Sequence, residues 1–471
     1  MRTARSTLVA LAAAATAAAM ISGCAKEEKL AVPNLLPETF LAVGDSVRNP
    51  TAYSQVLTWW GEDKDGEVAG YEYRWFIDPS EGSCRLDTNW VRTAETSLTF
   101  DLPVTRGQSY HRFEVRSIDN DEARDSSACK VTLPVTNAPP VVVLDPDFSL
   151  PDTTIGAFLV KWQGSDPNGD NTLTRYRVWL DESADAAQDI TPPDTVATFG
   201  PDDFAGRFGW RTFNLIAIDS GCDTSEVLTH TWFVKEPTGQ ILLVDDLRTA
   251  DQGETAEKIT DRFYRTGLDS LSEANGRAYS VLNIERYGGE LSAHNLPGLF
   301  GAFDLVIWYN DPNKTASARL AAAQGDLMDY LEGGGRLMLS SLAALGSGGA
   351  LQDSLWPEVL GVDSILVRNG STNLDCRNWA LWGNGAVGLD SLKVVGIWTG
   401  LECMLPDPAA TELYHINPGT AGGFQTVPYY LAILNSWQAA RTALVTFPIS
   451  RSDYYGNARV EYCKIVELLL Q

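Results

Sequence analysis

The sequence predicts a multidomain chain, with two all-β sandwiches followed by an α/β domain built on a doubly wound parallel sheet. The first observation is length, because 471 residues suit about three domains at ~150 residues each. The second is an internal repeat with a period of ~100 residues, the usual size of a sandwich module. The third is a change after Gln240, where apolar strands begin to alternate with helical patterns.

Composition and charge exclude several classes of protein. With 44% hydrophobic and 21% charged residues, the chain is expected to be globular and not disordered or fibrous. Its formal net charge of −25 argues against a nucleic-acid partner, since the phosphate backbone would be repelled. A single long apolar run, at the N-terminus, argues against a polytopic membrane protein.

Residues 1–23 have the features of an export signal. Arg2 and Arg5 precede an apolar stretch that is short for a membrane span. The stretch ends in Ile21-Ser22-Gly23-Cys24, which resembles a bacterial lipobox. The resemblance implies cleavage before Cys24 and acylation of this residue, palmitate among the chains. The alternative is an ordinary signal peptide with an incidental cysteine.

The lipobox resemblance implies a lipoprotein anchored in the cell envelope. Several acyl chains on one residue anchor a protein stably. Ala25 after the cysteine favours sorting to the outer membrane, and residues 24–32 form a short tether. The mature chain would keep 34 basic and 61 acidic residues, a net charge of −27. Anionic head groups would repel such a surface, so the protein should stand off from the membrane.

The remaining six cysteines are expected to meet an oxidising compartment. Pairing within domains favours disulfides between Cys84 and Cys129 and between Cys376 and Cys403. Cys222 and Cys463 would then be buried thiols or an interdomain bridge. Sequence alone leaves the connectivity open. No C-x-x-C or His-rich spacing predicts a zinc site, and no cofactor is expected.

The repeat is carried by a shared motif and by a shared strand. Trp59-Trp60-Gly61-Glu62-Asp63-Lys64-Asp65-Gly66 matches the segment that begins at Trp162, giving W-x-G-x-D-x-[DN]-G. Further on, residues 113–119 match residues 213–219. Alternating strands with Gly, Pro and Asp turns predict β-sandwiches over residues 33–136 and 137–236. The pattern resembles fibronectin type III and related immunoglobulin-like modules, a resemblance that names no ligand.

Acidic residues of the repeated motif have two interpretations. Asx-type turns, in which the side chain bonds its own backbone, are favoured. A calcium site is the alternative, since carboxylate and amide oxygens are Ca²⁺ ligands, but the twelfth-position Glu of an EF-hand is missing. The candidate ligands are Asp63, Asp65, Asp166, Asn168 and Asp170.

After Gln240 the sequence predicts parallel strands alternating with helices. Strands are expected at residues 241–246, 279–284, 304–309, 336–340 and 442–447, and helices at 255–266, 317–331 and 457–470. The segments ILLVDD, FDLVIWYN, YLEGGGRLMLSS and ALVTFPIS resemble the class I glutamine amidotransferase-like superfamily, including its ThuA-like branch. The resemblance covers residues 239–471 and implies a flavodoxin-like fold. Residues 342–441 match poorly and are expected to form a loop-rich insertion.

The resemblance implies a cysteine nucleophile at a strand-to-helix bend, which this chain lacks. The corresponding turn reads Leu339-Ser340-Ser341-Leu342-Ala343, without flanking glycines, and the family's downstream His-x-Glu pair is absent. A serine nucleophile at Ser340 or Ser341 with His415 as base is the catalytic alternative. We favour the interpretation that the serines cap the next helix and that no catalytic residue is present.

The carboxyl ends of the predicted strands define a candidate binding crevice. Ligands in open α/β sheets bind outside these ends, so Asp245, Asp246, Asn310 and Ser340 are expected to line it. The two acids would repel phosphate and suit a cation or a sugar hydroxyl, or else cap the next segment.

Four tryptophans of the insertion offer a further binding surface, because aromatic rings stack on sugars, although burial in a core is favoured. They are Trp379, Trp382, Trp398 and Trp437.

The sequence therefore predicts a lipid-anchored envelope protein with a binding, scaffolding or assembly role and a catalytically inactive C-terminal domain. Its expected partners are the membrane, through the anchor, and an envelope protein or glycan. The alternatives are an envelope hydrolase acting on glycans or amides through the C-terminal crevice, and a carbohydrate-binding surface protein.

Overall fold

The chain divides by its internal contacts into two compact units, residues 1–138 with 167–169, and residues 139–166 with 170–471. A computed structural model describes residues 33–43, 54–77, 89–102, 107–182, 186–204, 206–248, 254–311, 315–345, 349–366, 380–393, 401–416, 428–452 and 457–471. Cys24 and the segments predicted as signal peptide and tether lie outside these ranges. None of the helices described has both the length and the apolar character needed to cross a membrane.

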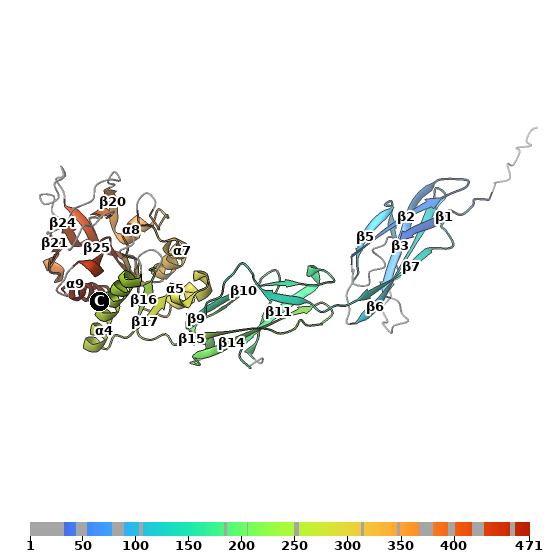
Figure 1. The fold of residues 1–471 in the computed structure, drawn as a ribbon. Coiled ribbons are helices and arrows are strands. Elements are labelled where there is room, and N and C mark those ends of the chain that lie inside the picture. The colour runs from blue at the N-terminus through green and yellow to red at the C-terminus, as the bar shows by residue number, and fades with distance from the viewer. Residues whose placement is uncertain are drawn as a thin grey trace, which may run out of the picture. The chain divides into compact units, whose positions relative to one another are not determined.

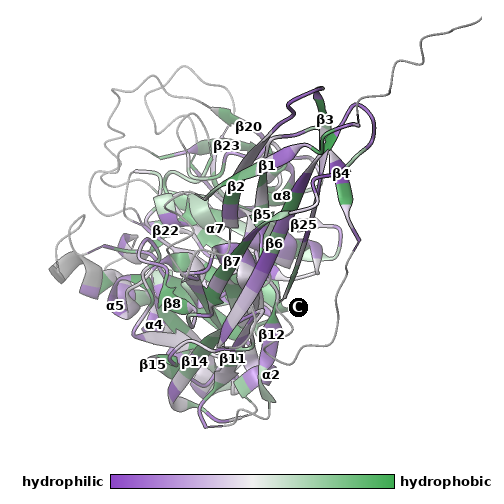
Figure 2. Cartoon of the chain, turned by 90° about the vertical axis from the view of Figure 1, so that its right-hand side faces the viewer, coloured by the Kyte–Doolittle hydropathy of each residue, from purple (hydrophilic) through white to green (hydrophobic). Residues whose placement is uncertain are grey.

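The first repeat forms a sandwich of two antiparallel sheets, as its alternating sequence predicts (Figure 1). One sheet has the order β1-β2-β5 and the other the order β4-β3-β6-β7. Hydrophobic and hydrophilic residues alternate along strands such as β6 (Figure 2), and the hydrophobic side chains fill the space between the sheets. The strands are β1 (Glu38–Val43), β2 (Ser54–Glu62), β3 (Val68–Ile77), β4 (Val91–Thr93), β5 (Ser97–Asp101), β6 (Gln108–Asp119) and β7 (Cys129–Thr136).

The second repeat has the same strand order. Its sheets are β8-β10-β13 and β12-β11-β14-β15, the latter extended by β9, which pairs parallel to β15. The strands are β8 (Val141–Leu144), β9 (Thr153–Ile155), β10 (Phe158–Ser165), β11 (Leu173–Leu180), β12 (Gln188–Ile190), β13 (Val196–Phe199), β14 (Gly209–Asp219) and β15 (Leu228–Lys235).

Packing explains why the repeated motif combines tryptophan with glycine. Trp162 is fully buried and lies edge-on to Tyr176, with ring centroids 5.5 Å apart, as Trp59 lies to Tyr71 at 6.4 Å. The tyrosine then passes over the glycine of the motif. A Cβ at Gly164 would lie 2.3 Å from the Tyr176 hydroxyl, so only glycine leaves room for the ring.

All five strands predicted after Gln240 form one parallel sheet in the order β17-β16-β18-β19-β26. Successive side chains of each strand point to opposite faces of the sheet and enter two separate hydrophobic cores. Helices cover both faces and complete these cores. One core contains residues of α4 and α9, and the other contains residues of α5 to α8. The elements are β16 (Ile241–Asp245), α4 (Glu254–Asn275), β17 (Tyr279–Asn283), α5 (Ile284–Tyr287), α6 (Leu296–Phe300), β18 (Leu305–Tyr309), α7 (Ala318–Glu332), β19 (Arg336–Ser340), α8 (Trp356–Leu360), β26 (Ala440–Val445) and α9 (Asn457–Leu470).

Residues 342–441 differ from the loop-rich insertion that the sequence predicts. Their described part contributes α8 and strands that continue the sheet beyond β26 through the antiparallel strand β25. Several pairings contain bulges, which interrupt the alternation that marks a strand in sequence. The strands are β20 (Val362–Leu366), β21 (Ala380–Gly383), β22 (Leu392–Lys393), β23 (Cys403–Pro406), β24 (Thr411–Ile416) and β25 (Tyr429–Trp437).

The second sandwich and the α/β region belong to one compact unit. Ile155 and Ala157 of the sandwich lie in the same hydrophobic core as α5 to α8. Asn295 Nδ2 donates to the Phe199 carbonyl oxygen at 2.9 Å. Residues 236–239 therefore join two parts that share a core.

Candidate functional site

Three adjacent parallel strands bring the predicted crevice residues to one edge of the sheet. Asp245, Tyr309 and Ser340 are in register at the ends of β16, β18 and β19. Asp246 and Asn310 follow directly, and their backbone N–H groups donate to the carbonyl oxygens of Tyr309 (3.1 Å) and Ser340 (3.0 Å). The four residues predicted from the strand ends thus lie together.

Asp245 is buried and held by two donors. Its Oδ2 accepts from Asn283 Nδ2 at 2.7 Å and its Oδ1 from the Leu247 N–H at 3.2 Å. Burial raises the pKa of the Asp245 carboxyl to about 7, against the opposing effect of the Leu247 bond. The Asp245 carboxyl can therefore be protonated near neutral pH.

Asp246 positions the start of α7. Its Oδ2 accepts from Trp308 Nε1 at 3.0 Å and from the Ser317 hydroxyl. Ser317 is the N-cap of α7, and its side chain accepts from the N–H groups of Arg319 and Leu320. Burial raises the pKa of Asp246 in spite of these bonds. Asp246 thus holds the N-cap residue of α7 in place and is not itself that N-cap.

The Ser340 hydroxyl belongs to a buried cluster around Asp311. Asp311 Oδ1 lies 2.5 Å from the Tyr264 hydroxyl and accepts from Ser340 Oγ at 3.3 Å, while Oδ2 accepts from Ser450 Oγ at 3.0 Å. Tyr264 also lies 2.8 Å from Ser340 Oγ. Burial raises the pKa of Asp311 to about 6, although the bonds from Tyr264, Ser450 and Ser340 lower it.

Sequence reasoning missed Asp311, Tyr264 and Ser450. Asp311 follows Asn310 at the end of β18, so the strand-end rule was sufficient to find it. Tyr264 lies on α4 and Ser450 follows β26, and no local pattern links either residue to this edge.

Asn310 has a fully buried side chain whose amide forms no hydrogen bond with any residue that the structure describes. Both Oδ1 and Nδ2 are without a partner. A buried polar group left in this way costs about 1–3 kcal/mol. Asn310 therefore offers one acceptor and two donors to a ligand or a water at this edge.

The structure does not bring the candidate serines and His415 together. Ser340 is the last residue of β19 and Ser341 follows it, whereas His415 lies on β24, and β26 and β25 lie between these two strands. Three strand spacings of ~4.8 Å place the two strands about 14 Å apart. His415 Nδ1 pairs with Glu412 Oε1, and Ser341 Oγ accepts from the Ala343 N–H at 3.4 Å.

Glu402, which the sequence did not single out, accepts from the Leu345 N–H at 2.9 Å in the loop after β19. Burial raises the pKa of Glu402 to about 8, against the lowering effect of the bonds from Leu345 and Ala344. Glu402, Asp311 and Asp245 are thus three carboxyls of the α/β region that protonate near neutral pH.

The residues predicted as turn or calcium ligands bond to nearby backbone groups. Asp63 Oδ1 accepts from the Asp65 N–H at 3.3 Å, an Asx-type turn, and Asp65 Oδ2 accepts from the Leu35 N–H. Asp170 Oδ1 accepts from the Asp166 N–H at 3.0 Å. Asn168 Oδ1 accepts from the Ala138 N–H. The described residues contain no group of three or more His, Cys, Asp or Glu side chains able to hold a metal.

Neither predicted disulfide can be compared with the structure, because Cys84 and Cys376 lie outside the described residues. Cys129 Sγ donates to the Thr39 carbonyl oxygen at 2.9 Å, and Cys403 is buried on β23. Cys222 is an exposed thiol and Cys463 Sγ donates to the Gly267 carbonyl oxygen. Cys222 and Cys463 do not form the interdomain bridge that was one of the two possibilities.

Two of the four tryptophans proposed for sugar stacking are described. Trp382 on β21 is 47% exposed, whereas Trp437 is buried and its Nε1 donates to Glu358 Oε1 at 3.2 Å. Trp379 and Trp398 lie outside the described residues. The described part of the insertion therefore offers one exposed indole.

No protein-family model matches the chain, and no curated protein matches it in sequence. Solved structures similar to part of the chain include the fibronectin(III)-like modules of Clostridium thermocellum CbhA, at 14% identity and a TM-score of 0.19, covering 42% of this chain and 95% of that chain. The FN1–FN3 domains of chicken CNTN1 are similar at 13% identity and a TM-score of 0.19, covering 44% of this chain and 68% of that chain. Likenesses of this strength assign no function to the chain.

The raised pKa values predict a pH-dependent stability. The carboxyls of Asp245, Asp311 and Glu402 have folded-state pKa values above their ordinary values of 3.8 or 4.5. The contribution of each carboxyl to the stability of the folded state is therefore full at a pH below the ordinary pKa, and it is lost as the pH rises through the folded-state values of about 6 to 8. We expect Glu402→Gln to leave the Tm nearly unchanged at pH 5 and to raise it above that of the wild type at pH 9. Thermal melts across this range measure the difference. Glu332→Gln, at the exposed end of α7, is the control, and an equal gain there at pH 9 would remove the special role of Glu402.

The unpartnered amide predicts that Asn310 contributes little to folding. Asn310→Ala and Asn435→Ala remove the same atoms from two buried sites, but Asn435 Nδ2 donates to the carbonyl oxygens of Glu358 (3.0 Å) and Val359 (3.1 Å). We expect Asn435→Ala to lower the free energy of unfolding by about 1–3 kcal/mol more than Asn310→Ala does. Denaturant titration measures both values. Equal losses would mean that Asn310 supports the fold.

Proposed function

We propose that this chain is a lipid-anchored protein of the cell envelope whose C-terminal domain binds a ligand or partner and does not catalyse a reaction. The two sandwiches, of fibronectin type III character, act as a spacer between the anchor at Cys24 and the C-terminal domain. The parallel strand order β17-β16-β18-β19-β26, which in chain order is 2-1-3-4-5, supports a flavodoxin-like, amidotransferase-related fold for that domain.

The observation that carries the non-catalytic role is the state of Ser340. The catalytic alternative needs Ser340 to be open to substrate and within hydrogen-bond reach of the His415 imidazole. Ser340 Oγ instead donates to Asp311 and lies beside the Tyr264 hydroxyl, in a fully buried cluster about three strand spacings from His415. The hydroxyl is thus held by an acid and a phenol, neither of which is a basic imidazole.

The same edge supports a binding role. In open α/β sheets the crevice forms where the strand order reverses, here between β16 and β18. Asn310 follows β18 at this point and has an unused amide. Asp246, Asp311 and Asp245 lie near it along the edge, and such carboxyls disfavour an anion. A neutral ligand with hydroxyl or amide groups fits these observations.

An envelope hydrolase acting on glycans or amides is the second candidate. It is favoured by the carboxyls of Asp245 and Asp311, whose pKa values of about 7 and 6 suit general acid or base catalysis near neutral pH. The two roles make opposite predictions for turnover.

We expect the purified full chain to hydrolyse chromogenic ester, anilide and glycoside substrates no faster than its Ser340→Ala, Asp311→Asn and Asp245→Asn variants. The physical reason is that the hydroxyl and carboxyl groups are already bonded within the fold. Initial rates measured across pH 5 to 9 provide the comparison. Saturable turnover that falls at least about a hundredfold in one folded variant would replace the binding role by the hydrolase.

The anchor predicts a defined N-terminus. We expect mass spectrometry of the chain isolated from a bacterial envelope to find Cys24 as the first residue, carrying acyl chains. A Cys24→Ala variant should keep its N-terminal segment and lose the added mass. A wild-type chain that keeps this segment with a free Cys24 thiol would contradict the lipoprotein proposal.

A further inference from the structure

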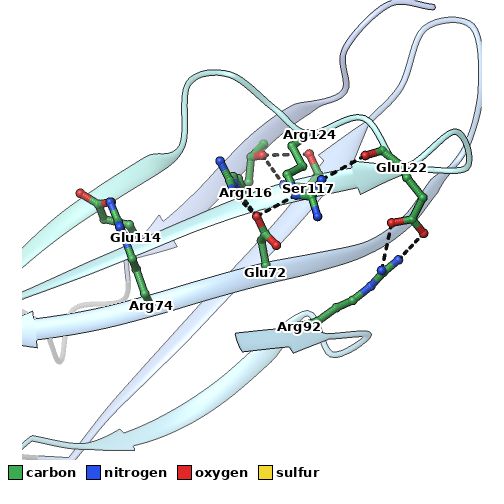
Figure 3. Close-up of polar contacts among 9 residues, drawn as sticks. Glu72, Arg74, Arg92, Glu114, Arg116, Ser117, Glu122 and Arg124 are labelled. Carbon is green, nitrogen blue, oxygen red and sulfur yellow. Dashed lines mark hydrogen bonds and ion pairs between the residues drawn. The ribbon is translucent and has the colours of Figure 1, made fainter. Parts of the chain in front are cut away.

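The outer face of one sheet in the first sandwich carries a cluster of charged side chains, which we call the arginine face (Figure 3). Its residues alternate along β3 and β6 with core residues such as Tyr73 and Phe113, so they point away from the core. Cross-strand register pairs Glu72 with Arg116 and Arg74 with Glu114. The face comprises Glu72, Arg74, Arg92, Arg112, Glu114, Arg116, Glu122, Arg124 and Lys130.

The carboxylates of the arginine face lie beneath the guanidinium groups. Glu72 and Glu114 are only 7% and 4% exposed. Glu114 is held by Arg74 at 2.6 Å and Arg112 at 3.0 Å. The side chains of these arginines are 26% and 35% exposed, so the layer that meets solvent is rich in guanidinium groups.

Glu72 is bracketed in the same way. Arg116 pairs with Glu72 from the neighbouring strand, and Arg124 Nε lies 3.1 Å from the same carboxylate. The Arg124 side chain is 45% exposed. Two buried carboxylates thus hold four arginines, which leaves two positive charges without a matching acid.

Charge counting sets the arginine face apart from the rest of the chain. It holds five arginines and Lys130 against Glu72, Glu114 and Glu122, a formal excess of three positive charges. The whole chain has a net charge of −25. Asp119 and Asp125, in and after the end of β6, already accept from backbone N–H groups of Ala123 and Thr39.

Ionisation of the buried carboxylate depends on the surrounding arginines. Burial raises the pKa of Glu114, but the bond from Arg74 and the charges of Arg74, Lys130 and Arg112 outweigh burial, and the pKa lies below its ordinary value. Glu114 thus stays ionised at neutral pH and keeps its two guanidinium groups in place.

An indole ring fixes two of the guanidinium groups. The Cζ atoms of Arg74 and Arg116 lie 4.5 Å and 4.2 Å from the centroid of the Trp90 ring. Arg74 uses Nε and Nη2 for Glu114, and among the residues that the structure describes no acceptor is seen for its Nη1. Arginines held by a carboxylate and a ring lose little freedom when a further anion binds.

We propose that the arginine face binds an acidic segment of a protein partner. The face already holds carboxylates between paired guanidinium groups, and the excess of guanidinium groups fits more of the same anion. The face has five arginines against one lysine, and Trp90 lies against two of the arginines. Protein–protein binding surfaces are likewise enriched in Arg and Trp and depleted in Lys.

The second sandwich lacks such a surface in its described part. On β11, Arg175 and Arg177 share Asp189 at 3.3 Å and 2.7 Å. This group of three has one excess positive charge and no tryptophan ring stacked on its arginines among the described residues. Arg175 and Arg177 therefore provide a matched control on the corresponding sheet of the second sandwich.

The test measures binding of poly-L-glutamate to the full chain by isothermal titration calorimetry at low and high salt. We expect binding that weakens with salt, and a Kd raised at least about tenfold by the double variant Arg112→Gln/Arg124→Gln. This variant leaves each buried glutamate one arginine, so the sandwich should still fold, which circular dichroism checks. The double variant Arg175→Gln/Arg177→Gln removes the same charge and should leave the Kd within about twofold.

Three outcomes would overturn the proposal. They are no binding of poly-L-glutamate by the wild type, equal losses in the two double variants, and binding of dextran sulfate without binding of poly-L-glutamate. The last outcome would assign the arginine face to an anionic polysaccharide. None of these results depends on the anchor or on the C-terminal domain, so failure here leaves the proposed function standing.

Discussion

The burial of polar groups at the ends of β16, β18 and β19 is the constraint on which the C-terminal domain depends. Apart from Arg336 at the start of β19, these strands are apolar and buried up to their last residue, so each carries a polar residue into a place that water does not reach. The Asp246 carboxyl accepts hydrogen bonds from Trp308 and from Ser317, the N-cap residue of α7. The start of α7 is therefore placed by a carboxylate at a strand end as much as by its own sequence.

The same constraint explains the cluster around Asp311. A fully buried carboxyl needs several donors, and Asp311 obtains them from Tyr264 on α4 and from Ser450 beyond β26. These contacts join segments 47 and 139 residues apart in the chain. Asn310, one residue earlier, has the same burial and finds no donor or acceptor for its side chain in the described part of the chain. This contrast between two adjacent residues makes Asn310 a candidate ligand contact.

The strands and helices around the site could be predicted because their signals are local. Continuous apolar runs indicated the strand ends, and the helix predicted over residues 317–331 agrees with α7 to within one residue at each end. The partners of Asp311 could not be predicted, since nothing near Tyr264 or Ser450 in the sequence indicates which edge they face. The position of His415 relative to β19 depends on the two strands between them, β26 and β25. The pairing of β25 with β24, the strand that carries His415, contains bulges. Bulges remove the alternation that sequence analysis uses.

The two sandwiches show where a repeat keeps its sequence and where it does not. Trp59 and Trp162 keep their place because each packs on a tyrosine across the core. The residue after that tyrosine faces outward and is Glu72 in one repeat and Arg177 in the other. Inward positions are fixed by packing, whereas outward positions are free to differ. Differences in binding between the repeats are therefore expected on the outer faces.

The net charge of the chain restricts the kind of partner that the arginine face can receive. At physiological ionic strength a charge is screened beyond ~8 Å, so three excess positive charges attract an anion only at close range. A large acidic body approaching the face would also meet the acidic residues elsewhere on the chain, which outnumber the basic ones. A narrow acidic segment can reach the guanidinium layer while the rest of its protein stays beyond the screening length. The size of the partner's contact region, and not only its charge, then follows from the electrostatics of this chain.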